Sequence, residues 1–200
     1  MYRAFLTDYM GTLRQDGFPD IIKYFETNSG LPLGDVRRII SKKYWPAWSL
    51  GEINEEEFWK GVCRDTELEY RGLLTDSINS ASQPIFYPML DFFEAVRKEG
   101  RKTGLITNIS RELLDSAEDD LKVSSRFDIV VPSFQIGLRK PDPRIYRTAL
   151  KILDSEPSEA VYIDNEETDV EGAQAVGIKA VKFKSVSQAV KDLEELRREV

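Results

Sequence analysis

The side chains of this chain that could do chemistry stand where apolar runs end. Asp8 closes an apolar run over residues 4–7 and opens the stretch Asp8-Tyr9-Met10-Gly11-Thr12-Leu13. A carboxylate at the tip of a strand, followed by a glycine-containing turn, is well placed to act as a nucleophile. Asp8 is therefore the first candidate for the reacting group.

Three later segments carry further polar groups of this kind. One apolar run ends in Thr107 and Asn108, and a later loop reads Lys140-Pro141-Asp142-Pro143. Another run ends in an acidic cluster from Asp164 to Asp169. Each segment alone is explained by ordinary helix caps and turns, but four such segments in this order indicate a site for phosphoryl transfer.

The chain has no histidine, and this limits its chemistry. Ser-His-Asp catalysis, Cys-His catalysis and His-ligated zinc are excluded. A general acid or base must be Asp, Glu, Lys or Tyr, and a metal must be bound mainly by oxygen, which favours magnesium. Cys63 is the single cysteine, and its apolar neighbours favour buried packing over nucleophilic catalysis.

Composition and charge indicate the class of protein. The 200 residues are 41% hydrophobic and 32% charged, with a net charge of −7, which suits one globular domain or one domain with a modest insertion. Nucleic acid is not an expected partner, because binding to a phosphate backbone needs clustered Lys and Arg. No apolar run approaches the roughly 20 residues that span a bilayer, so we expect no membrane partner and a cytoplasmic location.

The order of the predicted elements indicates an α/β fold. Residues 2–8 have the pattern of a strand, residues 15–85 have a helical pattern, and strands alternate with helices after residue 86. This alternation predicts a doubly wound parallel sheet covered on both faces. We therefore predict an α/β core domain over residues 1–14 and 86–200, with a small α-helical domain over residues 15–85.

Local signals mark the ends of several predicted helices. Pro19 suits the first position of a helix, and Asn54 with Glu57 predicts a capping box at the start of another. Ser110 is the expected N-cap of a helix in the core domain. A further helix is predicted over Leu68–Ile78.

The motifs resemble those of the haloacid dehalogenase-like (HAD) hydrolases, and the resemblance spans essentially the whole chain. The first stretch resembles the signature Asp-x-Asp-Gly-Thr-Leu, and the run ending at Thr107-Asn108 resembles the second motif of the family. Residues 140–146 match the third motif in its Lys-Pro-Asp-Pro-x-x-Tyr form, and Asp164 with Asp169 resembles the acidic pair of the fourth. The resemblance implies a Rossmann-like HAD core, with residues 15–85 as the α-helical cap that the family inserts after its first motif.

The resemblance also implies roles for individual residues. Asp8 would attack an electrophilic centre and form an aspartyl-enzyme intermediate. Thr107 would donate a hydrogen bond to the transferring group, and Lys140 would offset the negative charge of nucleophile and substrate. The residues expected to contact the substrate are Tyr9, Thr12 and Asn108.

A magnesium ion is the cofactor that the resemblance implies. Its ligands would be the carboxylates of Asp8, Asp164 and Asp169 and the backbone carbonyl of Met10. The expected substrate is a small phosphorylated metabolite, and its identity does not follow from the sequence, because the cap of this fold determines specificity.

Met10 departs from the signature, which has a second Asp at this position. That Asp protonates the leaving oxygen and later activates water in the usual phosphatases, and a thioether can do neither. The loss of a general acid or base costs about 10²–10⁴ in rate. Glu166 and Glu167 are the candidates for replacing it.

Alternative functions remain open at the level of sequence. A magnesium-dependent phosphatase or phosphotransferase for good leaving groups accounts for all four motifs. A metal-free 2-haloacid dehalogenase explains Met10, because halide leaves without a proton, and a phosphonatase would need a Schiff-base lysine such as Lys42, Lys43 or Lys60. A catalytically weak binding protein with the HAD fold is the fourth alternative.

The aromatic side chains of the helical domain are expected to form its own core. Trp48 and Tyr9 are the aromatics most suited to cover the site and exclude water. An exposed face of the cap is also a candidate contact for a homodimer.

Overall fold

The sheet of this protein is parallel throughout and has the strand order β3-β2-β1-β4-β5. The computed structural model describes residues 1–32, 34–70 and 83–199. The strands are β1 (Ala4–Thr7), β2 (Lys102–Thr107), β3 (Ile129–Pro132), β4 (Ala160–Asp164) and β5 (Lys179–Lys182). Because β1 lies between β2 and β4, with Thr7 opposite both Leu105 and Ile163, the residue that follows β1 emerges at the middle of the carboxyl edge.

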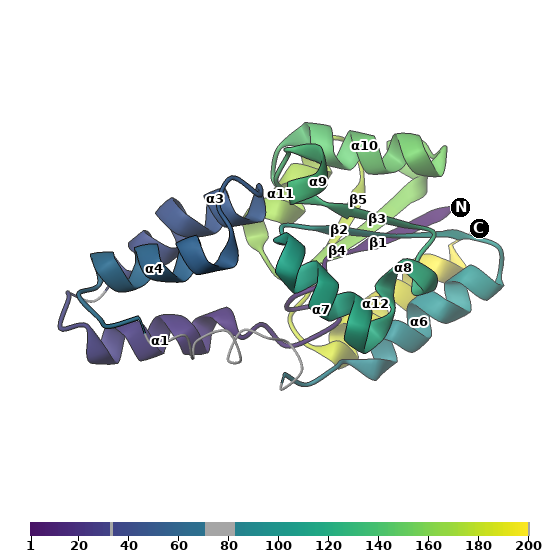
Figure 1. The fold of residues 1–200 in the computed structure, drawn as a ribbon. Coiled ribbons are helices and arrows are strands. Elements are labelled where there is room, and N and C mark those ends of the chain that lie inside the picture. The colour runs from purple at the N-terminus through teal and green to yellow at the C-terminus, as the bar shows by residue number, and fades with distance from the viewer. Residues whose placement is uncertain (33, 71–82, 200) are drawn as a thin grey trace.

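Helices cover both faces of the sheet, as Figure 1 shows. One face carries α9 (Ser133–Ile136), α10 (Pro143–Leu153) and α11 (Glu167–Ala175), and the other carries α6 (Tyr87–Lys98), α7 (Arg111–Leu121), α8 (Val123–Arg126) and α12 (Val186–Arg198). Alternate residues of β1 pack into different clusters, since Phe5 contacts Phe92 of α6 and Leu6 packs with residues of α10. The predicted doubly wound α/β fold is confirmed.

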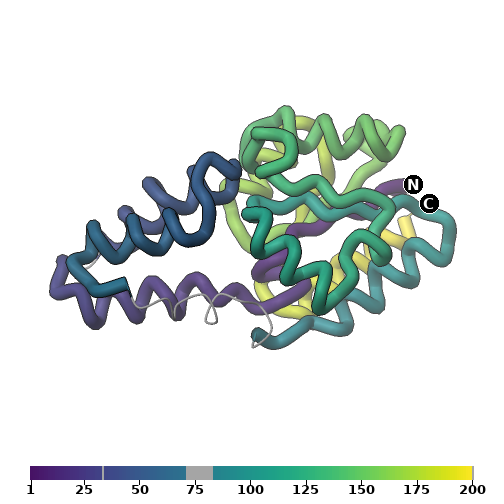
Figure 2. Tube along the Cα trace, in the orientation of Figure 1, coloured from purple at the N-terminus to yellow at the C-terminus, as the bar shows by residue number. Residues whose placement is uncertain are grey.

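The helical domain lies beyond the carboxyl edge of the sheet (Figures 1 and 2). Its described residues include α1 (Phe18–Asn28), α2 (Asp35–Arg38), a π-helical segment (Ile39–Tyr44), α3 (Trp45–Ser49) and α4 (Glu55–Asp65). Its interior is aromatic, with Trp48 fully buried and its ring 4.4 Å from that of Phe58. These side chains form the core of the domain, as predicted, and Cys63 is buried among them.

Two contacts hold this domain over the core. The indole N–H of Trp48 donates to Glu112 of α7 at 3.0 Å. The hydroxyl of Ser133 in α9 donates to the backbone carbonyl of Ser49 at 2.5 Å and accepts the backbone N–H of Ile109 at 3.0 Å. Because these bonds join the end of α3 to the loop after β2, the domain is anchored beside the carboxyl edge.

The segments that enter and leave the helical domain run side by side. Gln15 N–H donates to the Pro84 carbonyl and Phe86 N–H donates to the Leu13 carbonyl, each at 2.9 Å. This pairing lies next to the predicted domain limits at residues 14/15 and 85/86, which stay predictions.

Most of the predicted local signals have the expected geometry. In the capping box, Asn54 Oδ1 accepts the N–H of Glu57 at 2.9 Å and Glu57 Oε2 accepts the N–H of Asn54 at 2.8 Å. Ser110 caps α7 as predicted. The helix predicted over Leu68–Ile78 falls mostly on residues 71–82, which lie outside the described residues. Among the helices that are described, none has the length and apolar character to cross a membrane.

Candidate active site

Asp8 stands directly after β1 and is held by the backbone around it. Its N–H donates to the carbonyl of Ile163 on β4 at 3.1 Å. Its own carbonyl accepts two hydroxyl groups, from Thr7 at 2.8 Å and from Thr12 at 2.5 Å. Since these bonds fix the main chain on both sides of Asp8, its side chain projects from a rigid position at the strand end.

Gly11 allows the turn after Asp8 to approach the loop after β4. Its φ of +86° lies in the left-handed region that glycine adopts most readily. A Cβ at this position would lie 2.3 Å from the side-chain carbon Cγ of Asn165. The glycine of the first motif is therefore needed for both the backbone conformation and the close contact between two catalytic loops.

Lys140 is the centre of the charged cluster. Its Nζ lies 2.8 Å from Asp8 Oδ1, 2.7 Å from Asp164 Oδ2 and 3.6 Å from Asp169 Oδ2. The ammonium also donates to the Tyr162 hydroxyl at 2.9 Å. Lys140 is 4% exposed, so a single buried cation binds the first and fourth motifs together.

Asn108 positions Lys140 through its backbone. The Asn108 side-chain carbonyl accepts the N–H of Lys140 at 2.8 Å, and the amide nitrogen donates to the Lys140 carbonyl at 3.0 Å. On the other side, Gly172 of α11 lies so close to Pro141 that a Cβ there would be 2.7 Å from the proline Cβ. The loop that carries Lys140 is thus clamped between β2 and α11.

The cluster contains more carboxyl groups than one ammonium can balance. Burial raises the pKa of Asp8 to about 7, although Lys140 opposes the rise. Burial also raises the pKa of Asp169 and of Glu166, with the charge of Asp164 adding to both shifts. Burial alone would lower the pKa of Lys140, but the carboxylates of Asp164, Asp8 and Asp169 outweigh it and raise that pKa well above the usual range of lysine. An additional cation beside Asp8 would favour its ionised form.

A cavity of about 450 Å³ opens over this cluster, a size suited to a small molecule. Its core side is lined by Asp8, Asn108, Arg139, Lys140, Asn165, Glu166 and Asp169. Its cap side is lined by residues that include Phe18, Arg37, Lys42 and Trp45. The carboxyl edge of the sheet and one side of the cap therefore line the same cavity.

Four of the predicted site residues have a different environment from the one expected. Thr107 is 1% exposed at the end of β2 and is not among the residues that line the cavity. Thr12 is fully buried and uses its hydroxyl to hold the Asp8 carbonyl, and Tyr9 is buried in the apolar core. Neither of these two side chains is among the described residues that line the cavity. The Thr12 hydroxyl instead fixes the backbone of Asp8.

Asp164 is the fourth predicted site residue whose environment differs from the one expected. Its Oδ2 accepts from Lys140 and from the Tyr162 hydroxyl, and its Oδ1 accepts the N–H of Glu166 at 2.8 Å. It is fully buried and is not a lining residue. Asp164 therefore organises Lys140 from behind the cavity.

Trp48 does not cover the site, contrary to the expectation that it was the tryptophan most suited to do so. It is fully buried inside the helical domain. Trp45, one turn of helix earlier, is partly exposed and lines the cavity beside Phe18, with the two rings 4.3 Å apart. The aromatic wall of the cavity is therefore formed by these two residues.

The side chain of Met10 lines the cavity next to two carboxyl groups that could carry a proton. Glu166 is a lining residue, whereas Glu167 is exposed and pairs with Lys182 at 3.5 Å. Asp16, which the sequence analysis did not single out, also lines the cavity, and burial raises its pKa. Of the two predicted substitutes for the missing acid, only Glu166 lines the cavity.

The residues present fit magnesium in one mode of binding. No three carboxylate, cysteine or histidine side chains within residues 1–32, 34–70 and 83–199 are arranged to hold a metal alone. Magnesium usually binds through one or two carboxylates together with substrate phosphate and water. Asp8 and Asp169 line the cavity with raised pKa values, and they fit that mode.

Sequence reasoning also missed Tyr162 and Arg139. Tyr162 is two residues before Asp164 and thus on the same face of β4, which is the signal that could have identified it. Arg139 directly precedes Lys140 and lines the cavity. No pattern in the sequence separates it from an ordinary surface arginine.

Comparisons with known proteins agree with this architecture. A family model described as haloacid dehalogenase-like hydrolase matches residues 54–183. The chain is 32% identical over 216 residues to acyl-CoA dehydrogenase family member 10 of Mus musculus, covering 98% of this chain and 19% of that protein. It therefore spans about a fifth of the length of that curated relative.

Two further comparisons involve a phosphatase and a phosphate complex. The chain is 29% identical over 155 residues to phosphoserine phosphatase of Thermus thermophilus, covering 68% of this chain and 61% of that protein. A HAD family enzyme of Bacteroides thetaiotaomicron, solved with magnesium and inorganic phosphate, superposes with a TM-score of 0.75 at 20% identity. The superposition covers 92% of this chain and 95% of that one, and it shows that the two share a fold.

Proposed function

This chain belongs to the haloacid dehalogenase-like hydrolases, and on that premise we propose that it is a magnesium-dependent phosphatase or phosphotransferase. Its substrate would be a small phosphorylated metabolite. The observation that carries the proposal is Lys140, whose Nζ lies 2.8 Å from Asp8 Oδ1 at the floor of a cavity rich in carboxylates. A phosphatase among its relatives and a phosphate complex among proteins of the same fold support the same chemistry.

Asp8 would act as the nucleophile. Lys140 holds Oδ1, so Oδ2 would attack the phosphorus atom, and the bond from phosphorus to the leaving oxygen would break with its electron pair going to that oxygen. Water would then attack the phosphorus of the aspartyl phosphate and release inorganic phosphate with a regenerated carboxylate. An acceptor alcohol in place of water would give phosphotransfer. Lys140 would stabilise the negative charge that concentrates at the attacking end.

Magnesium, when bound, supplies positive charge that offsets repulsion between the phosphate and the carboxylates. Asp8 and Asp169 would hold it, with the backbone carbonyl of Met10 as the further ligand suggested by the motif. Asp164 would contribute by fixing Lys140, because both of its oxygens already accept hydrogen bonds.

Met10 restricts the substrates that this site can process. Its thioether cannot protonate a leaving oxygen, so acyl, aryl or anomeric phosphates would react fastest, since they depart with little need for a proton. A steep dependence of rate on the pKa of the leaving group is therefore part of the proposal.

The dehalogenase and phosphonatase alternatives have less support. Three carboxylates besides the nucleophile line the cavity, and the metal-free chemistry of a dehalogenase gives them no use. A Schiff-base lysine reacts as the neutral amine, which burial favours. Lys42 is exposed, and Lys43 and Lys60 are paired with Asp65 and Glu56.

The test measures release of phosphate from p-nitrophenyl phosphate and acetyl phosphate, with magnesium and with EDTA. Wild-type protein and Asp20→Asn, a control at an exposed carboxylate of α1, should turn over only with magnesium. Asp8→Asn should lose the activity by roughly 10⁴-fold or more. No turnover by wild type, or equal turnover by Asp8→Asn, would contradict the proposal, and chloride release from 2-chloropropionate would then identify a dehalogenase.

A further inference from the structure

The cap side of the cavity presents cations that have no carboxylate partner in the described part of the chain. Arg37 of α2 and Lys42 of the π-helical segment both line the cavity and are exposed to solvent. Neither forms an ion pair or side-chain hydrogen bond with another described residue. Two positive charges therefore face the volume that a substrate would occupy.

The residues next to them in sequence behave differently. Arg38 pairs with Asp35 at 3.1 Å and Lys43 pairs with Asp65 at 2.5 Å, and neither lines the cavity. Each cavity-facing cation thus has a chemically identical neighbour that points elsewhere and is balanced. Among the described residues, Arg37 and Lys42 therefore differ from their neighbours both in lining the cavity and in lacking an ion pair.

Arg139 adds a third cation from the core side. It lines the cavity, and its Nε is buried with no hydrogen-bond partner among the described residues. Burial lowers its pKa, with Asp169 opposing. A buried guanidinium N–H without an acceptor is costly, and an oxygen atom of a ligand in the cavity would satisfy it.

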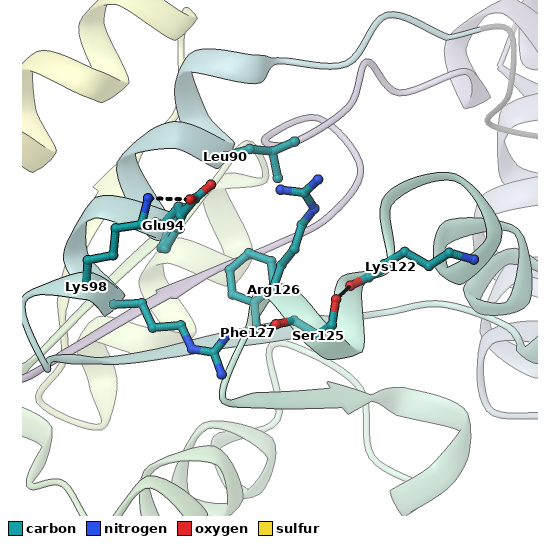
Figure 3. Close-up of a pocket in the computed structure, with 9 residues that line it drawn as sticks. Leu90, Glu94, Lys98, Lys122, Ser125, Arg126 and Phe127 are labelled. Carbon is teal, nitrogen blue, oxygen red and sulfur yellow. Dashed lines mark hydrogen bonds and ion pairs between the residues drawn. The ribbon is translucent and has the colours of Figure 1, made fainter.

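A second cavity offers an internal comparison (Figure 3). It has about 510 Å³ and is lined by basic and aromatic residues of α6 and the segment after α7. There Lys98 pairs with Glu94 at 2.6 Å and Arg97 pairs with Asp128 at 3.0 Å. Lys122 and Arg126 also line this second cavity, and neither forms an ion pair with another described residue. The cations of the second cavity are thus paired only in part and, among the described residues, they face no cluster of catalytic-type carboxylates such as the one below Arg37 and Lys42.

We propose that Arg37, Lys42 and Arg139 form a subsite for a second anionic group of the substrate, a carboxylate or a second phosphate. The inference rests on the proposed function, because the first anion is the phosphoryl group that would react at Asp8. The substrate class is then a phosphate carrying another negative charge at its far end.

The distribution of charge in the cavity favours this arrangement. Asp8, Glu166 and Asp169 come from the sheet edge, while Arg37 and Lys42 come from the facing cap. A second anion would be repelled by the carboxylates and attracted by the cap. Guanidinium groups bind carboxylate and phosphate through paired hydrogen bonds, so the subsite would orient the substrate with its phosphoryl group toward Asp8.

The experiment compares two aryl phosphates of nearly equal shape, 4-carboxyphenyl phosphate and its neutral analogue 4-carbamoylphenyl phosphate. Hydroquinone bisphosphate tests a second phosphate in place of the carboxylate. The value of kcat/KM is measured for wild type, Arg37→Gln and Lys42→Gln. Arg38→Gln and Lys43→Gln are the matched controls.

Wild type should prefer at least one of the doubly anionic compounds by about tenfold or more, mainly through KM, since a hydrogen bond to a charged group contributes about 1.5–3 kcal/mol. Arg37→Gln and Lys42→Gln should each reduce that preference severalfold, and the controls should keep it. Equal use of charged and neutral compounds by wild type, or equal effects of Arg37→Gln and Arg38→Gln, would overturn the proposal.

A binding measurement separates this proposal from the proposed function. Calorimetric titration of Asp8→Asn with each compound needs no turnover. A preference for the doubly anionic compounds that Arg37→Gln weakens in the Asp8→Asn background would support the subsite even if no phosphate were released. Turnover without any such preference would support the phosphatase and overturn the subsite.

Discussion

Lys140 at the sheet edge and Lys42 on the facing cap line the same cavity in opposite electrostatic surroundings. Lys140 is buried with three carboxylates within 3.6 Å. Lys42 is exposed and has no ion pair with another described residue. The side chain of Lys140 is therefore held by other groups of the protein, whereas that of Lys42 is available to a ligand.

This difference separates chemistry from selection of substrate. The sheet edge holds its polar groups through bonds that exist without a substrate, such as those that Lys140 donates to Asn108 and Tyr162. The cap contributes Arg37 and Lys42, which line the cavity and form no ion pair with another described residue. Variants at the edge should therefore change stability and kcat, while variants on the cavity side of the cap should change KM.

The largest expected effect comes from Lys140→Met. Removing the ammonium leaves Asp8 and Asp164 buried without their cation, which costs about 3–5 kcal/mol when one partner of a buried pair is lost. Lys42→Met should change the free energy of unfolding by less than about 0.5 kcal/mol. Urea unfolding at pH 7 measures both values, and equal losses would remove the distinction between edge and cap.

The pH dependence of the same variant provides a second check. Burial raises the pKa of Asp8 and of Asp169 even beside Lys140, so without the ammonium these two groups destabilise the fold when they are ionised. The loss of unfolding free energy in Lys140→Met, relative to wild type, should therefore become smaller as the pH falls through those raised pKa values. A deficit that grows toward low pH would mean that packing, not charge, is the main loss.

Asp16→Asn should have the next largest effect, and only on substrates whose leaving oxygen needs a proton. Asp16 lines the cavity, its pKa is raised by burial, and it has no cation within ion-pair distance among the described residues. As a proton donor it would matter for alkyl phosphates, where its loss should cost about 10² in kcat, and little for p-nitrophenyl phosphate. Wild-type activity on alkyl phosphates should fall as the pH rises through the raised pKa.

The design preserves the local structure. Asp16 Oδ1 accepts the N–H of Phe18 at 2.9 Å, and the asparagine oxygen can keep that bond. Asp20→Asn, in the first turn of α1, serves as the control. An equal loss of kcat on alkyl and aryl phosphates would show that Asp16 has a structural role. In that case the fall in activity with rising pH would remain in the variant.

Asn108→Ala should have a smaller effect that falls on kcat. Its amide holds both the N–H and the carbonyl of Lys140, so the variant loosens the lysine loop without removing charge. We expect kcat to fall about tenfold, corresponding to one to two hydrogen bonds of about 1 kcal/mol each. A change confined to KM would instead assign Asn108 to substrate binding, as the motif first suggested.

The parts of the site that could be predicted are those set by strand ends. In a parallel sheet every carboxyl end lies at one edge, so Asp8, Asn108 and Lys140 were expected to meet, and they do. Tyr162 was missed because an aromatic residue within an apolar run is read as core, although its hydroxyl reaches Lys140. Thr107 and Asp164 were predicted by motif, and their burial depends on tertiary packing that spacing does not reveal.

The sequence predicts that the cap is helical, but it does not predict which side chains of the cap face the cavity. Arg37 and Arg38 are adjacent, as are Lys42 and Lys43, so only the phase of the helix separates them. A π-helical segment spans Ile39–Tyr44, and its wider turn shifts that phase relative to an α-helix. A regular helical wheel does not include that shift, whereas the capping box at Asn54, which depends on local spacing alone, was predicted correctly.

Asn54→Ala should have the smallest effect, and it tests the same comparison between the sheet edge and the cap. Asn54 is exposed at the start of α4, remote from the residues that line the cavity. Loss of the cap should reduce the free energy of unfolding by about 1 kcal/mol and leave kcat unchanged, because the catalytic edge does not depend on α4 for its own bonds. KM should rise only if α4 holds α3 and the π-helical segment in place, which contact it directly. A matching fall in kcat would show that the sheet edge relies on the cap for its geometry, and the separation between the two regions would then not hold.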